Sequence, residues 1–521
     1  MFKDFVTALS LANLCFLRTW QHLLSPAYYY TPSSRVGELV GVVCNVILFT
    51  SLFWAGATLA RRSHDARLRK VAESAFLLAL VLPLNGLRAE LPLPRLTLLL
   101  GRSGLVLACV AVLLCVAVLV LRRRRGLVRA AVALLLILSP FVLITFAQAT
   151  WYVLQNRPTA AALNKVPPAP IRSDATTARP RVVWILFDEL DYRAAFDARP
   201  ASLSLPELDR LRAASLFATD AYATTDKTLT AIPSLLGGRL ACRAEESRPD
   251  ELILTFEDGG ARADWSTQSN VFTRAREIGV ASSLVGWYHP YCRVLRESVD
   301  ACHSVTMARQ TQGVAGKMLR QFNTALSPLN IERFISPRTY DADRREHVNE
   351  YLDTLAAARG AATALRYGLV FLHFPVPHPL GIYDRRASVL SADRGLGYFD
   401  NVALADKTLG ELRRAMEEAG VWDSTTVIVT SDHWWRVGEW ESHGALSKED
   451  VELWEKRTDH RVPFILKLAG QKEGATYDAG FNTVLTQDLV LTILGGNVTD
   501  AEGARRWLDA HRTFADSPCN K

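Results

Sequence analysis

The sequence lacks anything that resembles a basic recognition helix or an aromatic-rich binding sheet. These are the usual marks of a nucleic-acid-binding domain, so we expect no nucleic-acid partner. The net charge of +7 does not argue for one, because the basic residues are concentrated near the N-terminus. Residues 1–153 contain sixteen Lys/Arg and five Asp/Glu, a charge of +11, which leaves −4 for the rest of the chain.

A cleavage site of small residues is also missing after the first apolar stretch. A secretory signal peptide would end in such a site, whereas here further apolar segments follow. We therefore expect the N-terminal stretch to be retained. With 521 residues and a hydrophobic content of 49% that is unevenly distributed, the chain is expected to contain two parts.

Charged residues are almost absent from several long segments before residue 156. A bilayer core about 30 Å thick needs roughly 20 apolar residues of helix. Three segments meet that test: 39–60, 104–121 and 130–155, the last with a Pro at 140 as a kink. Segment 71–87 is weaker, and segment 5–17 is short enough to be an interfacial helix. We expect five spans, with four as the alternative.

Two basic clusters predict the orientation of these spans. Residues 61–70 and 122–129 contain five Lys/Arg each, and the positive-inside rule places both connections in the cytoplasm. The last span then runs outward, toward the periplasmic or extracellular side of a bacterial-type inner membrane. The sequence thus predicts a multi-pass membrane domain over 1–155, a linker rich in Pro, Ala and Thr over 156–180, and an extracytoplasmic domain over 181–521.

Cysteine is sparse and divides evenly between the two parts. Four of the eight lie in apolar segments, and Cys242, Cys292, Cys302 and Cys519 lie in the polar part. Cys292 and Cys302 close a short loop, which suits a disulfide in an oxidising compartment. Free buried thiols are the alternative.

Apolar runs alternate with charged helical patterns after residue 181. Strands are predicted at 182–187, 369–374, 426–430 and 463–468, and helices at 206–214, 341–358 and 399–419. This alternation predicts an α/β domain, a mostly parallel sheet sandwiched by helices. Functional groups in such sheets gather at the carboxyl ends of the strands.

Acidic and imidazole side chains follow two of these strands. Asp188, Glu189 and Asp191 come after the first, and Asp432 and His433 after the third. An exposed acidic loop would explain the first group alone, and a hydrogen-bonded structural pair the second. Together they favour a divalent metal site, with zinc or manganese as the ion.

A Thr-rich segment lies between the two groups. Thr228 stands at the start of a predicted helix, where an N-cap is the simplest role for a hydroxyl. A metal-bound hydroxyl at a helix N-terminus is also an activated nucleophile. The ion favours the alkoxide, and the terminal amides favour an incoming phosphate.

The ordered set of motifs resembles the alkaline phosphatase and sulfatase superfamily over most of residues 181–468. It comprises the apolar strand ending in Asp188, Thr228 with the run Leu-Leu-Gly-Gly-Arg239, the segment 373–379 with His at both 373 and 378, and Ser-Asp432-His433. This resemblance implies an alkaline-phosphatase-like fold.

The sequence departs from the sulfatases at the nucleophile. A sulfatase needs Cys or Ser in a Cys-x-Pro-Ser-Arg pattern, but Thr228, Thr230 and Ile232 occupy the Cys, Pro and Arg positions. Sulfatase activity is therefore not expected. A Thr with Pro233 five residues later is similar to the membrane phosphoethanolamine transferases and the lipoteichoic-acid-synthase-type phosphoglycerol transferases.

The resemblance implies roles for five residues at the centre of the site. Thr228 corresponds to the catalytic nucleophile, and Asp188, Thr228, Asp432 and His433 to the primary metal site. Asp188 stands where those transferases commonly have Glu. Glu189 is therefore a candidate additional or substitute ligand.

Five further residues are candidates for the surrounding pocket. His378 and His443 are similar to residues that bind a second metal or the substrate phosphate, with a solvated or capping imidazole as the alternative. His373, Trp287 and His289 are weaker candidates for the pocket lining. Buried aromatic core is the alternative for Trp287 and His289.

Three functions are compatible with these residues. The resemblance implies a metal-dependent transferase that moves a phosphoethanolamine- or phosphoglycerol-type group from a phospholipid donor to a hydroxyl of a glycan or lipid acceptor, through a phospho-threonine. An extracytoplasmic phosphodiesterase or phosphatase would use the same residues with water as acceptor. A non-catalytic envelope sensor or assembly protein is disfavoured because Thr228 and the Asp432–His433 pair are present.

Overall fold

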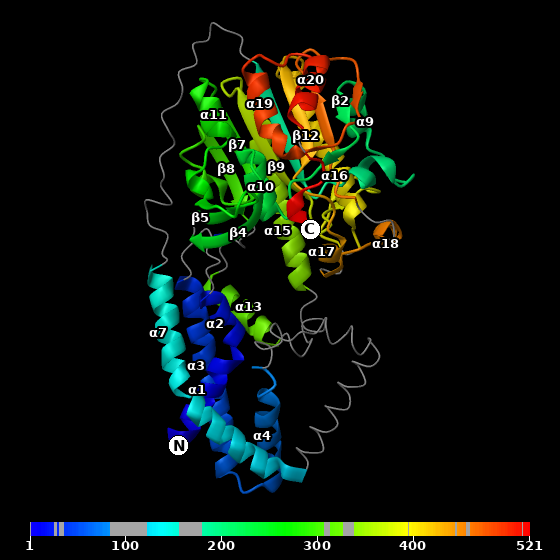
Figure 1. Cartoon of the computed structure of the whole chain (residues 1–521). Coiled ribbons are helices and arrows are strands. Elements are labelled where there is room, and N and C mark those ends of the chain that lie inside the picture. Colours follow the sequence, from blue (N-terminus) through cyan, green and yellow to red (C-terminus); the bar gives the residue numbers. More distant parts are fainter. Residues whose placement is uncertain are drawn as a thin grey trace. The chain divides into compact units, whose positions relative to one another are not determined.

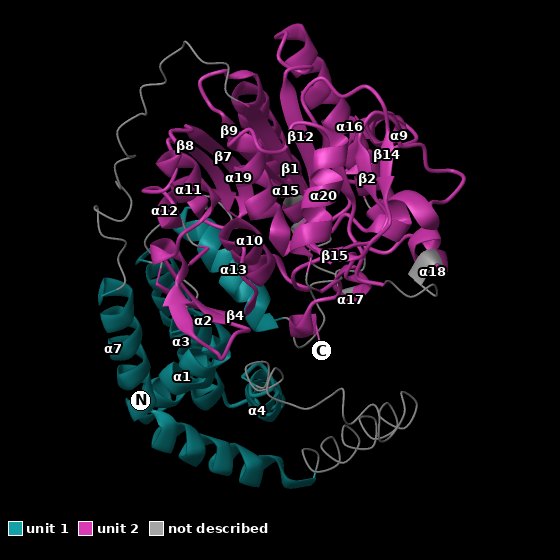
Figure 2. Cartoon of the chain, turned by 45° about the horizontal axis from the view of Figure 1, so that its top comes forward, with its two compact units in different colours: residues 1–26, 33–157, 309–337 teal, residues 27–32, 158–308, 338–521 magenta. Residues whose placement is uncertain are grey.

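The computed structural model contains two compact units (Figures 1 and 2). It describes residues 2–24, 29–30, 36–83, 122–155, 180–248, 250–306, 313–326, 338–393, 395–442, 445–454, 459–512 and 514–520. Unit 1 consists of Met1–Pro26, Ser33–Arg157 and Arg309–Pro337, and unit 2 of Ala27–Pro32, Pro158–Ala308 and Arg338–Lys521. Two short segments thus belong to a different unit from their neighbours in sequence. The linear division at 155 and 181 stays a prediction.

Unit 1 is helical in the residues described. Its helices include α1 (Phe2–Cys15), α2 (Leu17–Leu24), α3 (Val36–Arg62), α4 (Ala66–Ala79), α7 (Pro140–Gln155) and α13 (Val314–Leu326). Helix α13, which packs against α3, was not predicted from the sequence. Asn45 donates to Gln321 Oε1 over 3.2 Å, and Gln321 donates to the carbonyl of Glu38 over 2.9 Å. These buried amides fix the register of the two helices.

One described helix, α3, is long and apolar enough to cross a membrane, with 27 residues and a mean hydropathy of 2.0 over its best window. A second candidate is the pair Arg122–Leu138 and Pro140–Gln155, which is bent by 41° at the expected proline. The predicted segment 104–121 lies outside the described residues, as does the end of 71–87. The number of spans therefore stays a prediction.

Unit 2 contains a central sheet of eight strands in the order β14, β2, β13, β12, β1, β9, β7, β8 (Figure 1). The bounds are β1 (Arg181–Asp188), β2 (Leu216–Ala218), β7 (Ser282–Tyr288), β8 (Ala301–Thr306), β9 (Leu369–Pro377), β12 (Thr425–Ser431), β13 (Phe464–Lys467) and β14 (Ala475–Tyr477). Neighbouring strands pair in parallel except that β13 is antiparallel to β12 and β2. The predicted mostly parallel α/β fold is confirmed.

Helices cover both faces of this sheet, and β1 is apolar at every position from Val182 to Phe187. Val183 and Ile185 face one core with α9 (Pro206–Ala213), α15 (Arg338–Thr363) and α16 (Tyr398–Glu418). Val182 and Trp184 face the other core with α10 (Thr228–Gly237), α11 (Val271–Glu277), α19 (Thr486–Leu494) and α20 (Ala501–His511). Burial on both sides explains the continuous apolar run.

Smaller elements surround the carboxyl ends of the strands. They are β3 (Ala221–Tyr222), β4 (Ala241–Arg248), β5 (Glu251–Phe256), β6 (Arg262–Asp264), α12 (Tyr291–Val294), β10 (Tyr383–Asp384), β11 (Val389–Leu390), α17 (Val437–Ser442), α18 (Lys448–Trp454) and β15 (Phe481–Asn482). Strands β4, β5 and β6 form a separate antiparallel sheet.

The four cysteines of the polar part form two disulfides. Cys292 pairs with Cys302, as the short loop suggested, and Cys242 pairs with Cys519 across 277 residues. Cys15 and Cys44 are free thiols, whereas Cys109 and Cys115 lie outside the described residues.

Candidate active site

The acidic residues that follow β1 lie close to Asp432 and His433, which follow β12, because these two neighbouring strands end at the same level. Phe187 pairs with Ser431 in the parallel register, so the residues that follow each strand lie side by side. The Ser431 hydroxyl donates to the carbonyl of Phe187 over 2.7 Å and accepts from the amide of Leu190 over 2.8 Å. The amide of Glu189 donates to Asp432 Oδ1 over 3.1 Å. These bonds lock the two strand ends together.

Thr228 is the first residue of α10, and its hydroxyl points to this junction. Its Oγ1 lies 3.1 Å from His433 Nε2, and 3.5 and 3.4 Å from the two carboxylate oxygens of Asp188. The N-cap position belongs to Lys227. The structure therefore brings Asp188, Thr228, Asp432 and His433 together, and all four are almost completely buried.

The donor set fits a divalent cation. One ligand atom each of Asp188, Asp432 and His433 lies within 4.8 Å of the others. The ring of His433 places Nδ1 2.9 Å from the carbonyl of Trp434, and since a carbonyl only accepts, Nδ1 carries the proton and Nε2 presents a lone pair. Among the described residues, buried Oδ2 of Asp432 meets no partner with hydrogen-bond geometry.

The burial of neighbouring carboxylates at this site also favours a bound cation. Burial raises the pKa of Asp188, and the neighbouring carboxylates of Asp432 and Glu189 raise it further. Burial lowers the pKa of His433, and the positive charge of Arg436 acts in the same direction. Two ionised carboxylates are costly at one dry site unless a positive charge balances them, and an oxygen-and-imidazole set suits a divalent metal.

Glu189 lies beside this group, and its carboxylate is held by two other residues. Arg436 Nε donates to Oε1 and Trp440 Nε1 to Oε2, each over 2.9 Å. Burial raises the pKa of Glu189 to about 8, although Arg436 opposes that shift. Its backbone has a φ of +69°, a conformation uncommon outside glycine. Ligand atoms of Glu189, His378 and Glu439 form a second group within 4.8 Å.

His378 follows β9 and lies next to Trp287. The centroids of the His378 and Trp287 rings are 4.9 Å apart, and His378 Nε2 is 3.8 Å from Glu439 Oε1. Trp287 is buried and donates from Nε1 to Glu350 Oε2 over 2.9 Å. His443 lies outside the described residues, so its role in binding a second metal or the substrate phosphate stays a prediction.

His373 and His289 are both completely buried near the four central residues. His373 Nε2 lies 3.8 Å from Asp188 Oδ2, and its Nδ1 lies 2.8 Å from the Tyr291 hydroxyl. His289 contacts the carbonyl of Thr228 through Nε2 and the Tyr29 hydroxyl through Nδ1. Burial lowers the pKa of both rings to about 3.

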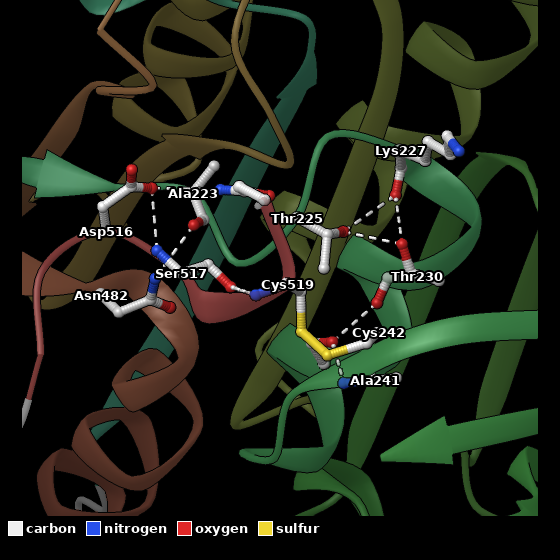
Figure 3. Close-up of a disulfide and its surroundings, with 12 residues drawn as sticks. Ala223, Thr225, Lys227, Thr230, Ala241, Cys242, Asn482, Asp516, Ser517 and Cys519 are labelled. Atoms are coloured by element: carbon white, nitrogen blue, oxygen red, sulfur yellow. Dashed lines mark hydrogen bonds between the residues drawn. A yellow bond between two sulfur atoms is a disulfide. The ribbon is translucent and has the colours of Figure 1, made fainter. Parts of the chain in front are cut away.

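The C-terminal tail reinforces the loop that leads to Thr228 (Figure 3). Asn482 Nδ2 donates to the carbonyls of Ala223 and Ala515 over 2.9 and 3.1 Å. The Thr225 and Thr230 hydroxyls are 2.7 Å apart. The Cys242–Cys519 disulfide joins the tail to the strand that follows α10.

Several residues that contact the predicted site residues were not predicted from the sequence. Among them are Tyr29, Tyr291, Arg436 and Trp440. Arg436 stands three residues after His433, a proximity that could have identified it. The others had no usable signal, because single aromatic residues are typical of core packing.

The fold and the buried carboxylate–imidazole–hydroxyl group define a sulfatase-like protein of the alkaline phosphatase superfamily. Residues 180–495 match the family described as "Sulfatase", and the chain belongs to that family. Members use a divalent metal, and the group described above could hold one.

Individual relatives are distant. A segment is 24% identical over 111 residues to lipoteichoic acid synthase 1 of Bacillus subtilis (strain 168), covering 20% of this chain and 17% of that protein's length. Among solved structures, an alkaline phosphatase superfamily protein from Vibrio parahaemolyticus has a TM-score of 0.36 at 13% identity, over 61% of this chain and 66% of that one. A phosphonate monoester hydrolase from Silicibacter pomeroyi has a TM-score of 0.39 at 16% identity, over 64% and 78%.

Proposed function

We propose that the protein is a metal-dependent phosphotransferase with Thr228 as nucleophile. It would move a phosphoethanolamine- or phosphoglycerol-type group from a phospholipid to a hydroxyl of a glycan or lipid. The observation that carries this proposal is the position of Thr228 Oγ1, 3.1 Å from His433 Nε2 and 3.4 Å from Asp188 Oδ2. A hydroxyl at that point, at the N-terminus of α10, is placed to attack phosphorus.

The side chain of Thr228 argues against sulfate-ester hydrolysis despite the family name. Sulfatases use an aldehyde made from Cys or Ser, whereas oxidation of a secondary alcohol such as that of Thr gives a ketone. The alcohol itself remains a good nucleophile for phosphoryl transfer. The similarity to a lipoteichoic acid synthase supports the same choice.

The reaction would proceed in two displacements. Held by Asp188, Asp432 and His433, a divalent ion would supply the Lewis acidity that lowers the pKa of the Thr228 hydroxyl. Thr228 Oγ1 loses its proton and bonds to phosphorus as the phosphorus–oxygen bond to diacylglycerol breaks, and the departing oxygen takes up a proton. In the second step the acceptor hydroxyl loses its proton and its oxygen bonds to phosphorus, the bond between phosphorus and Thr228 Oγ1 breaks, and Thr228 Oγ1 takes up a proton.

Other residues of the site would bind and orient the substrate. His378 lies beside Trp287 at the end of β9, where its imidazole could hold a phosphate oxygen. His443 would act with it. The buried surroundings of Thr228 would keep water from competing with the acceptor.

We further propose that the chain is a multi-pass protein of a bacterial-type inner membrane with its catalytic part on the periplasmic or extracellular side. Helix α3 supports membrane attachment, and a lipid donor has to be met at a membrane surface. The two disulfides support an oxidising compartment for unit 2.

Intact-mass analysis of the purified chain tests the covalent step. The chain is incubated with phosphatidylethanolamine or phosphatidylglycerol, with and without Zn²⁺ or Mn²⁺. We expect a metal-dependent adduct on Thr228 that is absent in Thr228→Ala. Thr230→Val is the matched control, because that hydroxyl bonds to Thr225 and Lys227 instead. Unchanged activity in Thr228→Ala would refute the mechanism, and release of the group to water alone would indicate a hydrolase.

A further inference from the structure

We infer that His289 and Tyr29 are positioning residues for the nucleophile: Tyr29 holds His289 in the one tautomer that donates a hydrogen bond to the peptide carbonyl of Thr228. This inference rests on the proposed role of Thr228. It concerns a segment that precedes α3 in the sequence and belongs to the catalytic unit (Figure 2).

The geometry consists of two hydrogen bonds that meet on one imidazole ring. His289 Nε2 lies 3.1 Å from the carbonyl oxygen of Thr228, and Nδ1 lies 2.8 Å from the Tyr29 hydroxyl. Both side chains are completely buried. The three residues are far apart in the sequence, so this contact is specific to the folded unit.

The chemistry of the partners assigns every proton. A carbonyl oxygen accepts and never donates, so Nε2 must carry a hydrogen. The ring is neutral, because complete burial disfavours a charged imidazolium. Nδ1 therefore has a lone pair, and the Tyr29 hydroxyl donates to it. In the other tautomer the Nε2 lone pair would face the Thr228 carbonyl and repel it.

Tyr29 is itself fixed by its surroundings. The guanidinium of Arg293 donates to its carbonyl, and its ring meets the His289 ring edge to face at 5.8 Å. Trp265 also packs against the His289 ring, with the two ring centroids 4.9 Å apart. Because Tyr29 is held in one position, its hydroxyl can determine which tautomer the His289 ring adopts.

The bond matters because of where Thr228 stands. As the first residue of α10, it lies at a helix end, where the backbone frays more readily than in the helix interior. A bond from the rigid core to its carbonyl limits rotation of this peptide, and so the direction in which Oγ1 points. Misplacement of a reacting atom by about 1 Å can lower a rate about a hundredfold.

Tyr30 provides a matched control for Tyr29. It is the next residue, and its hydroxyl donates to the Tyr288 hydroxyl over 3.0 Å. Its ring also packs edge to face, against Tyr288. Tyr30→Phe therefore removes a hydroxyl from the same segment without removing the donor to His289.

The first measurement is turnover of bis(4-nitrophenyl) phosphate by the metal-loaded full chain, which reports Thr228 chemistry whatever the natural acceptor. We expect Tyr29→Phe to lower kcat roughly tenfold to a hundredfold with little change in KM. Tyr30→Phe should match the wild type. His289→Ala should lose at least as much as Tyr29→Phe, and His289→Gln, whose amide can still donate to Thr228, should recover part of that loss.

The second measurement is independent of activity. Ring-¹⁵N-labelled histidine in the full chain reports the tautomer of His289, assigned by the signal lost in His289→Gln. We expect a protonated Nε2 in the wild type and in Tyr30→Phe, and a mixture of tautomers in Tyr29→Phe. This result without transfer from lipid would support the inference while the proposed function fails.

Two results would overturn the inference. One is an unchanged kcat and tautomer in Tyr29→Phe. The other is an equal loss of activity in Tyr29→Phe and Tyr30→Phe, which would mean that the segment serves only general stability.

Discussion

The Thr228 hydroxyl oxygen lies 3.1 Å from Nε2 of His433, although 205 residues separate the two in the sequence. The contact joins the start of α10 to the end of β12. Because the proton of the His433 ring is committed to the Trp434 carbonyl, Nε2 is free to accept from Thr228 or to bind a cation. A side chain that sequence alone would accept as a helix cap is thus directed at the junction of two strands.

Replacing Asp432 by Asn should remove metal binding and activity together. Its buried Oδ2 meets no hydrogen-bond partner among the described residues, and an amide cannot supply the negative charge that a cation needs there. Changes to outer partners of metal ligands typically cost about 10–100-fold in affinity, so loss of a direct ligand should cost at least about 100-fold.

Metal content after equilibrium dialysis against Zn²⁺ or Mn²⁺ measures this effect. Asp423→Asn is the control, because that carboxylate is exposed and pairs only with Lys472 among the described residues. A chelator should abolish wild-type activity, and added metal should restore it. Full metal content in Asp432→Asn would contradict the assignment.

Arg436→Met should destabilise the fold because it leaves a buried carboxylate unpaired. Arg436 Nε donates to Glu189, which is completely buried, and Nη2 lies 2.7 Å from Glu439. Removing one partner of a buried ion pair typically costs about 3–5 kcal/mol. We expect a loss of about 3 kcal/mol in the free energy of unfolding, measured by chemical denaturation.

A control at an exposed ion pair and a double variant separate the effect of the buried charge from that of lost contacts. Lys472→Met breaks an exposed ion pair with Asp423 and should change stability by less than about 1 kcal/mol. Arg436→Met combined with Glu189→Gln should recover much of the loss, since the completely buried charge at position 189 is removed. A double variant as unstable as Arg436→Met alone would show that lost contacts, rather than charge, cause the effect.

The sequence was sufficient for three inner strands because continuous apolar runs, buried on both faces, mark them, whereas the inner strand β7, with two serines and a glycine, was not predicted. The apolar runs at 182–187, 369–374 and 426–430 correspond to β1, β9 and β12. The edge strand β8, with a half-buried Ala-Cys-His-Ser-Val-Thr pattern, gave no comparable signal. Similarly, β2 and β14 have three residues each, too short for a periodicity to be recognised.

The same contrast holds for the site. Asp188, Asp432 and His433 could be predicted because parallel strands bring their carboxyl ends to one edge of the sheet. Residues that contact the site from other parts of the fold could not be predicted in this way. The indole of Trp440 reaches Glu189 across 251 positions, and Tyr29 reaches His289 across 260. Such contacts depend on tertiary packing, which local patterns do not encode.

The two disulfides should contribute unequally to stability. Cys242 and Cys519 are 277 positions apart, whereas Cys292 and Cys302 are 10 apart. In the chain-entropy description the loop-length term favours the longer loop by about 3 kcal/mol. Replacing both cysteines of the 242–519 pair by Ser should therefore lower the Tm more than replacing both of the 292–302 pair. Equal changes in Tm, measured by calorimetry, would contradict this ranking.

Lys467 should make the folded protein more stable as the pH rises. Its side chain is buried, its ammonium donates to the carbonyls of Trp422 and Thr425, and burial lowers its pKa from 10.5 to about 8. Between these values the unfolded chain binds the proton more tightly than the folded protein. The free energy of unfolding therefore increases with pH, and the contribution is complete above about 10.5.

The upper limit of that contribution follows from the same two values. The interval from about 8 to 10.5, at about 1.4 kcal/mol per pH unit, corresponds to about 3 kcal/mol. Chemical denaturation of the wild type and Lys467→Met at several pH values isolates the effect, because other titrating groups cancel in the difference. The free energy of unfolding of the wild type, relative to that of Lys467→Met, should increase as the pH rises from 8. The same difference measured against Lys448→Met, a change at an exposed lysine, should stay constant. A difference that is constant with pH would mean that Lys467 keeps its ordinary pKa in the folded protein.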